Sequence, residues 1–459
     1  MKPLSVSQIR SIVDGELIHG SDNVIVYNGA YRLKQVKNQN TIFFSKTVIL
    51  DWESLKELFP MVIVTNRKIS QNERLENLTI IKVNDVEEAY WKFVNYYRSL
   101  FHIPVIAITG TSGKTTTKEM IKHILSGEKT VAATNSSNNS RTAHLQYLLS
   151  IDDETDAAVF ETAVGAPGDV LRAGNYFKPT IGIITNIGAH HLNYCKTLEA
   201  YIKAKGEMAE VLNHSGVLII NSEDKNSKKL DLKNFKGRII KVGTDPSCHF
   251  KANNIQYCKD GMRFNVQFKE KNYSMFVPGY GEHQVYNALA AIAAVNEIGI
   301  DLTEAASRLK TFQNLNKHLQ VYKGMNGSTI LDDTWSMTTT SLEAALKVLN
   351  EVGKSKKRVA ILGTITDLGS WGYIIHEQAG EIICQNGVDV LITIGEHARI
   401  MADQAVKNGL DSKIYSFKNS ILVYDILKKI LDEDTIVLIK GDMYSKPIID
   451  LAVKIRKKE

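Results

Sequence analysis

A glycine-rich segment at residues 109–116 has the residue types and spacing of a phosphate-binding loop. It reads TGTSGKTT and follows the apolar run VIAI. Glycines let backbone N–H groups close around phosphate oxygens, Lys114 supplies a positive charge, and the Thr115 hydroxyl can bind Mg²⁺ at a helix N-terminus. Ile108 stands where the generic GxxxxGK[ST] pattern has its first glycine, so the pattern is the shorter GTxGKTT. The residues predicted to bind a nucleotide here are Gly110, Thr111, Ser112, Gly113, Lys114, Thr115 and Thr116.

The surrounding pattern places this loop in a βα unit. VIAITG is a short, continuous apolar run typical of a buried parallel strand, and residues 115–125 have a helical pattern. A glycine-rich turn without a ligand is the alternative, but a position between a buried strand and a helix favours a phosphate loop. Further buried-type runs at 157–160, 181–185 and 217–220 predict a doubly wound parallel sheet.

Two more α/β segments flank this centre. Residues 1–101 mix short strand-like runs with helical stretches, and the runs STILDD, RVAILGT, DVLITIG and TIVLIKGD alternate with helical segments after residue 316. Residues 238–277 have short alternating patterns that predict a small appended antiparallel sheet. The fold class is therefore α/β. At about 150 residues per domain, 459 residues predict about three domains, with boundaries at 1–101, 102–315 and 316–459.

Composition narrows the function classes. Lys and Arg total 56 against 50 Asp and Glu, and this net charge of +6 is spread along the chain, so no nucleic-acid partner is expected. There is no apolar run of about 18 residues that could span a membrane and no apolar core of a signal peptide near the start. Four scattered cysteines without a CxxC pair fit a reducing compartment. We expect a soluble, cytoplasmic monomer that does not act on a membrane.

The stretch ITGTSGKTTTKEMI resembles the ATP loop of the Mur ligases, the ATP-dependent carboxylate–amine ligases of bacterial cell-wall synthesis. The resemblance is densest over residues 103–300, looser to 459 and weakest before 100, and it is greatest to the branch that adds D-alanyl-D-alanine to UDP-N-acetylmuramoyl-tripeptide. It implies an N-terminal domain for the acceptor, a central P-loop ATPase and a C-terminal Rossmann-like domain for the amine. It also implies ATP and Mg²⁺ as cofactors and an ADP-forming reaction through an acyl phosphate.

The resemblance carries over a catalytic set of Lys114, Glu161, His191 and Lys205. TNIGAHHLNY is similar to the family's TNxxxAHL, whose histidine helps to hold a metal; counting places His191 there and leaves His190 as a solvated side chain. Lys205 in AKGEM matches a lysine that carries a carbamate from CO₂, which requires a lowered pKa. Without the family motifs, Glu161 would be an ordinary carboxylate at the end of a strand, His191 a loop histidine and Lys205 a lysine on a helix surface. The implied metal ligands are Thr115, Glu161, His191 and Lys205.

Other motifs imply contacts to the nucleotide. Asn138 and Asn139 in ATNSSNNS match the end of the family's TxxNxNN stretch, near Mg²⁺ and the phosphates. His283 and Asn287 lie four apart on one helix face and resemble the residues that contact adenine. Asp333 ends a strand, as does the family's aspartate near the ribose.

The positions that recognise substrates depart from the family pattern. Residues 28–46 contain neither the DSR nor the DGH motif, and SRTAHLQ after Asn139 is unusual. Ser336 and Thr338 replace asparagines of DDxYNANP, and Asp442 and Met443 replace the serine and arginine of KGSR. The leading hypothesis is therefore a Mur-type ligase that joins an amino acid or peptide to a carboxylate acceptor, UDP-linked or not, with the usual UDP-muramoyl peptide as only one of the acceptors that the sequence allows. The alternatives are the standard D-alanyl-D-alanine-adding ligase and a non-catalytic nucleotide-binding scaffold.

Overall fold

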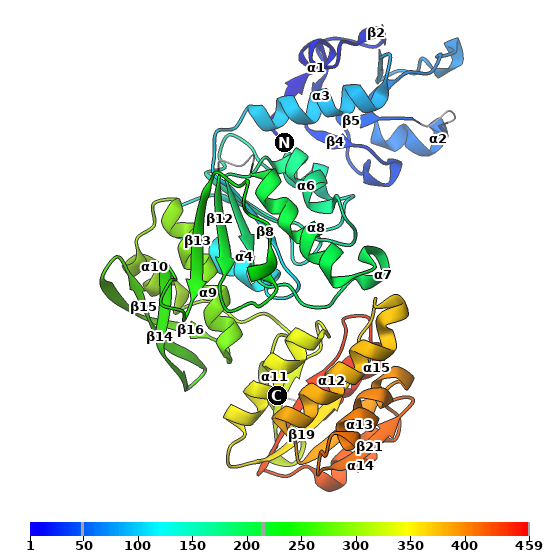
Figure 1. The fold of residues 1–459 in the computed structure, drawn as a ribbon. Helices are drawn as coiled ribbons and strands as arrows, with labels where there is room; N and C mark the ends of the chain where they lie inside the picture. The colour runs from blue at the N-terminus through cyan, green and yellow to red at the C-terminus, as the bar shows by residue number, and fades with distance from the viewer. Residues whose placement is uncertain (47–49, 213–215, 458–459) are drawn as a thin grey trace. The chain divides into compact units, whose positions relative to one another are not determined.

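The computed structural model describes residues 1–46, 50–212 and 216–457 (Figure 1). These residues form two compact units, one of residues 1–107, 128–163 and 171–181 and one of residues 108–127, 164–170 and 182–459. Sheets of five, nine and six strands dominate the described part of the chain, which confirms the α/β class. The division into three domains, 1–101, 102–315 and 316–459, remains a prediction.

The five-stranded sheet lies in the first unit. Its order is β2 (Glu16–His19), β7 (Leu78–Lys82), β6 (Met61–Thr65), β5 (Thr41–Phe44) and β4 (Asn28–Ala30). All neighbours are parallel except β2 and β7. A short antiparallel pair, β1 (Leu4–Ser5) and β3 (Ile25–Val26), accompanies it.

Both faces of this sheet are buried, which explains its continuous apolar strands. Ile42 and Phe44 point to one face, where they share a core with α1 (Val6–Val13) and α3 (Val86–Ser99). Phe43 points to the other face, toward Leu55 of α2 (Trp52–Leu55). The sheet is therefore held from both sides.

The nine-stranded sheet contains the predicted phosphate loop. Its order is β16-β15-β14-β13-β12-β11-β8-β10-β9. The strands are β8 (Val105–Thr109), β9 (Val131–Ala133), β10 (Ala157–Glu161), β11 (Ile181–Ile184), β12 (Val217–Asn221), β13 (Arg238–Gly243), β14 (Phe250–Cys258), β15 (Gly261–Phe268) and β16 (Lys271–Pro278). The helices are α4 (Lys114–Leu125), α5 (His144–Leu149), α6 (Asp169–Phe177), α7 (Leu192–Cys195), α8 (Leu198–Val211), α9 (Glu282–Glu297) and α10 (Leu302–Leu309).

The expectation of a small appended antiparallel sheet over residues 238–277 is confirmed for β14, β15 and β16 but was wrong for β13. Strand β13 pairs in parallel with β12, and β14 pairs in parallel with β13. Only β14, β15 and β16 are antiparallel, and they extend the large sheet. The alternating pattern correctly indicated strands with one exposed face. It does not predict which strand is the neighbour of each one in the sheet.

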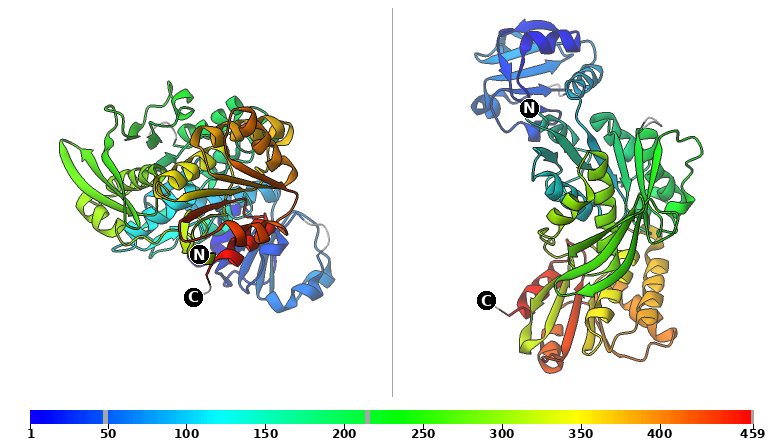
Figure 2. Two further views of the ribbon diagram at one scale, coloured as in Figure 1. Left: turned by 90° about the horizontal axis from the view of Figure 1, so that it is seen from below. Right: turned by 90° about the vertical axis from the view of Figure 1, so that its left-hand side faces the viewer.

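The six-stranded sheet is formed by the C-terminal part of the chain. Its order is β17 (Gln320–Lys323), β18 (Thr329–Asp333), β22 (Thr435–Lys440), β19 (Lys357–Leu362), β20 (Val390–Ile394) and β21 (Lys413–Phe417). The helices are α11 (Thr339–Val352), α12 (Gly372–Asn386), α13 (Glu396–Lys407), α14 (Val423–Ile430) and α15 (Lys446–Ile455). Helices α14 and α15 pack on one face, and α11 and α13 contact strands β22 and β20 (Figure 2). This is the Rossmann-like arrangement expected from the sequence.

Candidate active site

The phosphate loop lies between β8 and α4, as the sequence predicts. Gly110 and Gly113 have φ values of 147° and 83°, which disfavour residues with a side chain. A Cβ atom at Gly110 would lie 1.9 Å from Thr185 Oγ1, and one at Gly113 would lie 2.4 Å from Asn287 Oδ1. Both glycines are therefore required by conformation and by close approach.

Thr185 and Asn186 fix the shape of the loop. The Thr111 N–H donates to the Asn186 carbonyl at 2.9 Å, and the Ser112 N–H donates to Asn186 Oδ1 at 3.1 Å. The Thr185 hydroxyl and the Asn186 amide in turn donate to the Ser112 carbonyl at 2.7 and 2.9 Å. The TNxxxAHL motif alone gives no sign of the support that Thr185 and Asn186 give, because their contacts with the loop depend on tertiary structure.

Replacing Gly113 by alanine should weaken nucleotide binding, because it adds a Cβ against Asn287 and strains the backbone at positive φ. Strain of about 1–3 kcal/mol corresponds to a loss in ADP affinity of roughly 5- to 150-fold, measurable by calorimetric titration. Gly372→Ala is the control, since a Cβ at that helical position meets nothing within 4 Å. Equal ADP affinities of the two variants would contradict the steric argument.

Lys114 begins α4 and folds back onto its own loop. Its ammonium group donates to the Gly110 carbonyl at 2.9 Å and to the Thr111 carbonyl at 3.1 Å. Thr115 is half-buried in the first turn of α4, and Thr116 is buried. The cation and the threonine hydroxyls thus lie at a helix N-terminus, the usual location for a phosphate group.

Lys205 is buried on α8 and reaches the end of β8. Its Nζ atom donates to Thr109 Oγ1 at 3.2 Å and to the Gly110 carbonyl at 3.0 Å. Burial lowers its pKa well below the usual value, and repulsion from Lys114 lowers it further. A lowered pKa increases the neutral fraction of the amine, which is the form that reacts with CO₂. The plain surface-lysine alternative is therefore wrong for Lys205.

His190 and His191 lie side by side after β11, with ring centroids 3.9 Å apart. His191 precedes α7 in a left-handed conformation, and its Nδ1 atom is hydrogen-bonded to Asp367. Burial lowers the pKa of His191, whereas Asp367 opposes that shift. The prediction that His190 is solvated holds only in part: the side chain is half-buried, and desolvation lowers its pKa well below the usual value. Burial depends on tertiary packing, which the motif does not encode.

Glu161 and Asn139 come together in the first unit. Glu161 ends β10 and is buried, and the Asn139 side-chain amide donates to Glu161 Oε2 at 3.0 Å. The neighbouring Asn138 accepts a hydrogen bond from Tyr147 through its backbone carbonyl at 2.8 Å. Asn138 is thus a backbone anchor, whereas Asn139 orients a carboxylate.

His283 and Asn287 project from one face of α9, as the four-residue spacing predicts. Asn287 contacts the phosphate loop at Gly113, and His283 lies near Asp333. Burial lowers the pKa of His283 to about 4, and Asp333 acts in the opposite direction. His283 is therefore a neutral side chain at neutral pH.

Because its pKa is lowered on folding, His283 should make the folded state less stable in acid. The unfolded histidine binds a proton below pH 6.5 but the folded one only near pH 4, so stability falls as the pH drops through this window. The shift corresponds to at most about 3 kcal/mol. Urea unfolding at pH 7.5 and 4.5 should show a smaller difference for His283→Gln than for the wild type. The exposed control, His102→Gln, should retain the wild-type difference.

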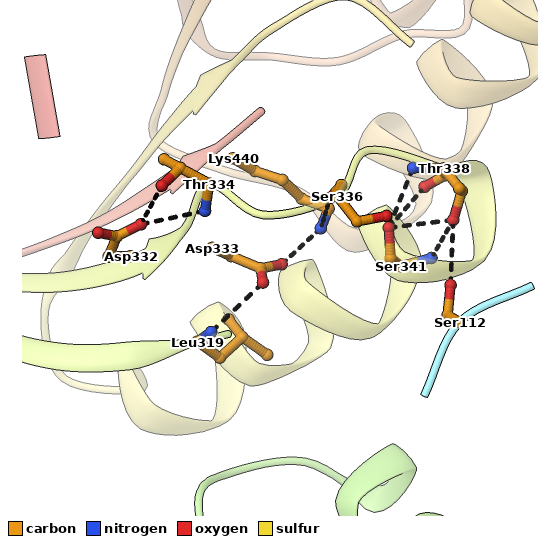
Figure 3. Close-up of polar contacts among 9 residues, drawn as sticks. All are labelled: Ser112, Leu319, Asp332, Asp333, Thr334, Ser336, Thr338, Ser341 and Lys440. Atoms are coloured by element: carbon orange, nitrogen blue, oxygen red, sulfur yellow. Dashed lines mark hydrogen bonds and ion pairs between the residues drawn. The ribbon is translucent and has the colours of Figure 1, made fainter. Parts of the chain in front are cut away.

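Asp333 lies at the end of β18 within a polar network (Figure 3). It forms an ion pair with Lys440 and accepts from the Leu319 N–H at 3.3 Å. Lys440 also donates to the Ser336 carbonyl at 2.8 Å. Asp332, by contrast, accepts from Thr334 and pairs with Arg456, so it stabilises the end of the strand.

Thr338 connects this segment to the phosphate loop. Its hydroxyl caps α11 by accepting from the Ser341 N–H, and it lies 3.5 Å from Ser112 Oγ (Figure 3). From the sequence, Thr338 was identified only as a replacement for an asparagine of DDxYNANP. Ser341 stands where the usual capping box has Glu or Gln, and the contact with Ser112 depends on tertiary structure.

Two family models match the part of the chain that follows residue 107. The Mur ligase middle domain matches residues 108–295, and the Mur ligase, glutamate ligase domain matches residues 319–443. The chain belongs to the Mur ligase family. It is an ATP-dependent, ADP-forming ligase, so the scaffold alternative is not supported.

Named relatives of this Mur ligase are UDP-N-acetylmuramoyl-tripeptide--D-alanyl-D-alanine ligases. The protein from Bacillus subtilis (strain 168) is 26% identical over 369 residues, 80% of this chain and 79% of the relative. The protein from Haemophilus influenzae (strain ATCC 51907 / DSM 11121 / KW20 / Rd) is 26% identical over 409 residues, 88% of each chain.

Solved structures show the same fold. MurF from Acinetobacter baumannii (crystal structure I) has a TM-score of 0.84 at 21% identity and covers 99% of this chain and 98% of that chain. MurF ligase from Thermotoga maritima in complex with ADP has a TM-score of 0.76 at 18% identity and covers 94% and 97%. The Mur ligase fold thus extends over the weakly matching N-terminal region.

Two features are absent from the described residues of this Mur ligase. No helix in residues 1–46, 50–212 and 216–457 combines the length and apolar character needed to cross a bilayer. Within the same residues, no three histidine, cysteine, aspartate or glutamate side chains gather as a ready metal site. The predicted ligand set includes a threonine and a lysine, which lie outside those residue types.

Proposed function

We propose that this Mur ligase joins D-alanyl-D-alanine to the terminal carboxylate of UDP-N-acetylmuramoyl-tripeptide. The observation that supports ligase chemistry most directly is Lys205, buried with a lowered pKa against the phosphate loop. The substrate assignment follows the names of relatives that match 79% and 88% of their own lengths. The proposal therefore takes its chemistry from the site and its substrates from the relatives.

The nucleotide would occupy the loop and the residues around it. Backbone N–H groups of the loop hold the phosphates, and Lys114 exchanges its two loop carbonyls for phosphate oxygens. Asn287 contacts the loop at Gly113, and with neutral His283 it holds the adenine. Asp333, oriented by Lys440 and the Leu319 N–H, holds the ribose.

The reaction has two steps, transfer of a phosphoryl group to the acceptor carboxylate and transfer of the acyl group to the amine. The acceptor carboxylate attacks the γ-phosphorus of ATP, which releases ADP and forms an acyl phosphate. The amine of D-alanyl-D-alanine then attacks the carbonyl carbon, loses a proton, and the tetrahedral species collapses to an amide and free phosphate. The loop and Lys114 stabilise the charge that develops on phosphate oxygens.

The donor set fits Mg²⁺ in its chemistry. In the second unit, a threonine hydroxyl at Thr115 and a carbamylated Lys205 would provide oxygen ligands that this ion prefers, and His191 would add a nitrogen ligand. The buried carboxylate of Glu161, in the first unit, stays a predicted ligand. When bound, Mg²⁺ neutralises phosphate charge. Asn139 orients Glu161, and Asp367 orients His191.

Incubating the protein with ATP, UDP-N-acetylmuramoyl-tripeptide and D-alanyl-D-alanine tests this proposal. Mass spectrometry should detect the pentapeptide product, with one ADP and one phosphate released per product. Omitting either the acceptor or the amine should stop phosphate release. No product under conditions in which a known ligase of this type is saturated would reject the substrate assignment.

A different amine or acceptor is the second candidate, and the C-terminal departures favour it. Asp442 and Met443 stand where the family has serine and arginine, and the Thr366 hydroxyl donates to Asp442 at 2.7 Å. An aspartate there cannot form the bidentate pair by which an arginine grips a carboxylate. A panel of amines with phosphate release as the readout tests it; exclusive use of D-alanyl-D-alanine would reject it.

A further inference from the structure

Two segments of the second unit that are distant in sequence lie in direct contact. The histidine segment, residues 186–196, follows β11 and contacts the phosphate loop through Asn186. The aspartate segment, residues 363–371, follows β19. The indole N–H of Trp371 donates to the Lys196 carbonyl at 2.6 Å, although 175 positions separate the two residues. A side chain of the C-terminal sheet region thus holds the backbone of the segment that carries His191.

The backbones of the two segments approach closely and are strained. A Cβ atom at Gly369 would lie 2.8 Å from Asn193 Oδ1 and 3.2 Å from Asn193 Cα, so a side chain there would push the segments apart. His191, Lys196 and Asp367 have positive φ values of 52°, 66° and 61°. Residues with a side chain adopt this conformation at an energetic cost, and they are concentrated at functional sites. The strain lies on both sides of the contact.

The aspartate segment is fixed by hydrogen bonds on either side of its aspartate. His376 of α12 is buried, and its Nε2 atom accepts from the Ile365 N–H at 3.1 Å. Its Nδ1 atom therefore carries the proton and donates to the Gly372 carbonyl at 2.6 Å. The Thr366 hydroxyl also donates to Asp442 at 2.7 Å. These bonds order the backbone from which Asp367 reaches the histidine segment.

The Asp367 carboxylate selects one tautomer of His191. A carboxylate can only accept a hydrogen bond, so the Nδ1 atom of His191 that is bonded to it carries the proton. Burial favours the neutral ring by lowering the pKa of His191. The Nε2 atom then has the free electron pair that a metal ion needs. The positive charges of Lys114 and Lys205 act on the same ring, which places it near the phosphate loop.

We propose that Asp367 and Trp371 are positioning residues for His191 in the ligation reaction. Asp367 fixes the ring with its Nε2 atom free for the metal ion, and Trp371 holds the backbone of the same segment through Lys196. This inference rests on the proposed function, in which His191 binds the metal ion. It adds that the metal ion is fully bound only when the histidine and aspartate segments are in contact.

Pulsed electron paramagnetic resonance of Mn²⁺ tests this proposal, with Mn²⁺ and ADP as the only added ligands. Bound Mn²⁺ reports a coordinated imidazole through the hyperfine coupling of its nitrogen. The wild type should show this coupling, and His191→Gln should lack it. Asp367→Asn should lose it, because the asparagine amide can donate to Nδ1 and thereby favour the other tautomer. Its Mn²⁺ affinity should fall about 10- to 100-fold.

Matched variants separate the carboxylate and the indole from general packing. Asp367→Glu keeps a carboxylate and should retain the nitrogen coupling, and Asp411→Asn, at an exposed aspartate, should behave as the wild type. Trp371→Phe keeps a ring but loses the N–H donor, so its Mn²⁺ affinity should fall about 2- to 10-fold. Trp52→Phe loses an indole hydrogen bond in the first unit and should not change this affinity. ADP affinity without a divalent ion should be unchanged in all variants.

Wild-type nitrogen coupling and Mn²⁺ affinity in Asp367→Asn would overturn the proposal, as would a wild type without nitrogen coupling. An equal loss in Asp367→Glu would assign the effect to packing and would also overturn it. Wild-type affinity in Trp371→Phe would overturn the role of the indole. These measurements use neither acceptor nor amine. A protein that meets them but forms no product therefore refutes the proposed function alone, and product formation by Asp367→Asn at the wild-type kcat refutes the positioning role alone.

Discussion

Lys205→Met should lower kcat for ligation by roughly 10²–10³-fold while ADP affinity stays within a few-fold of the wild type. Methionine has a similar length and fills the buried space on α8, so the fold is preserved. It cannot, however, form a carbamate. Phosphate release with both substrates present measures the rate, and the wild-type rate should rise with dissolved CO₂.

Lys203→Met is the matched control, because Lys203 is exposed on the same helix. It should have wild-type activity and the same response to CO₂. Wild-type kcat in Lys205→Met would show that the buried amine has no role in the reaction, and the lowered pKa would then be only a consequence of packing.

Lys114→Ala should lower kcat by a similar factor and should also weaken ADP binding. The ammonium group now donates to two carbonyls of its own loop and is positioned to transfer those hydrogen bonds to phosphate oxygens. Removing it leaves developing phosphate charge without its cation. Single-turnover phosphate release separates this loss in chemistry from the loss in binding.

The control for Lys114→Ala is Lys122→Ala, an exposed lysine on the same helix. It should change neither quantity. A Lys114→Ala protein that still turns over ATP at the wild-type rate with both substrates would contradict the assignment of the loop as the catalytic nucleotide site.

Local patterns were enough to predict the strands and helices that carry the central motifs. The glycine loop, the strand before it and the spacing of His283 and Asn287 are local properties, and the structure places them as expected. The edge strand β21 and helix α15 were not predicted. KIYSF has a mixed polar character, and α15 has a proline in its first turn. Such elements depend on the sheet on which they pack.

Long-range features could not be predicted from the motifs. The pocket lined by Arg32, Arg141 and Arg172 draws residues from three separated stretches, and only the fold brings them together. The partial burial of His190 and the contact between Asp367 and His191 have the same origin. A motif identifies which residues take part in chemistry but not which residues surround them.

The bonds from Thr185 and Asn186 to the phosphate loop have a consequence for how ATP is bound. Ordering a flexible backbone costs about 1–2 kcal/mol per residue. In this chain the cost is met during folding, so the incoming nucleotide finds a preorganised cradle and loses little affinity to conformational entropy. Thr185 and Asn186 bear no charge and need not touch ATP, yet they favour ATP binding because they order the loop before the nucleotide arrives.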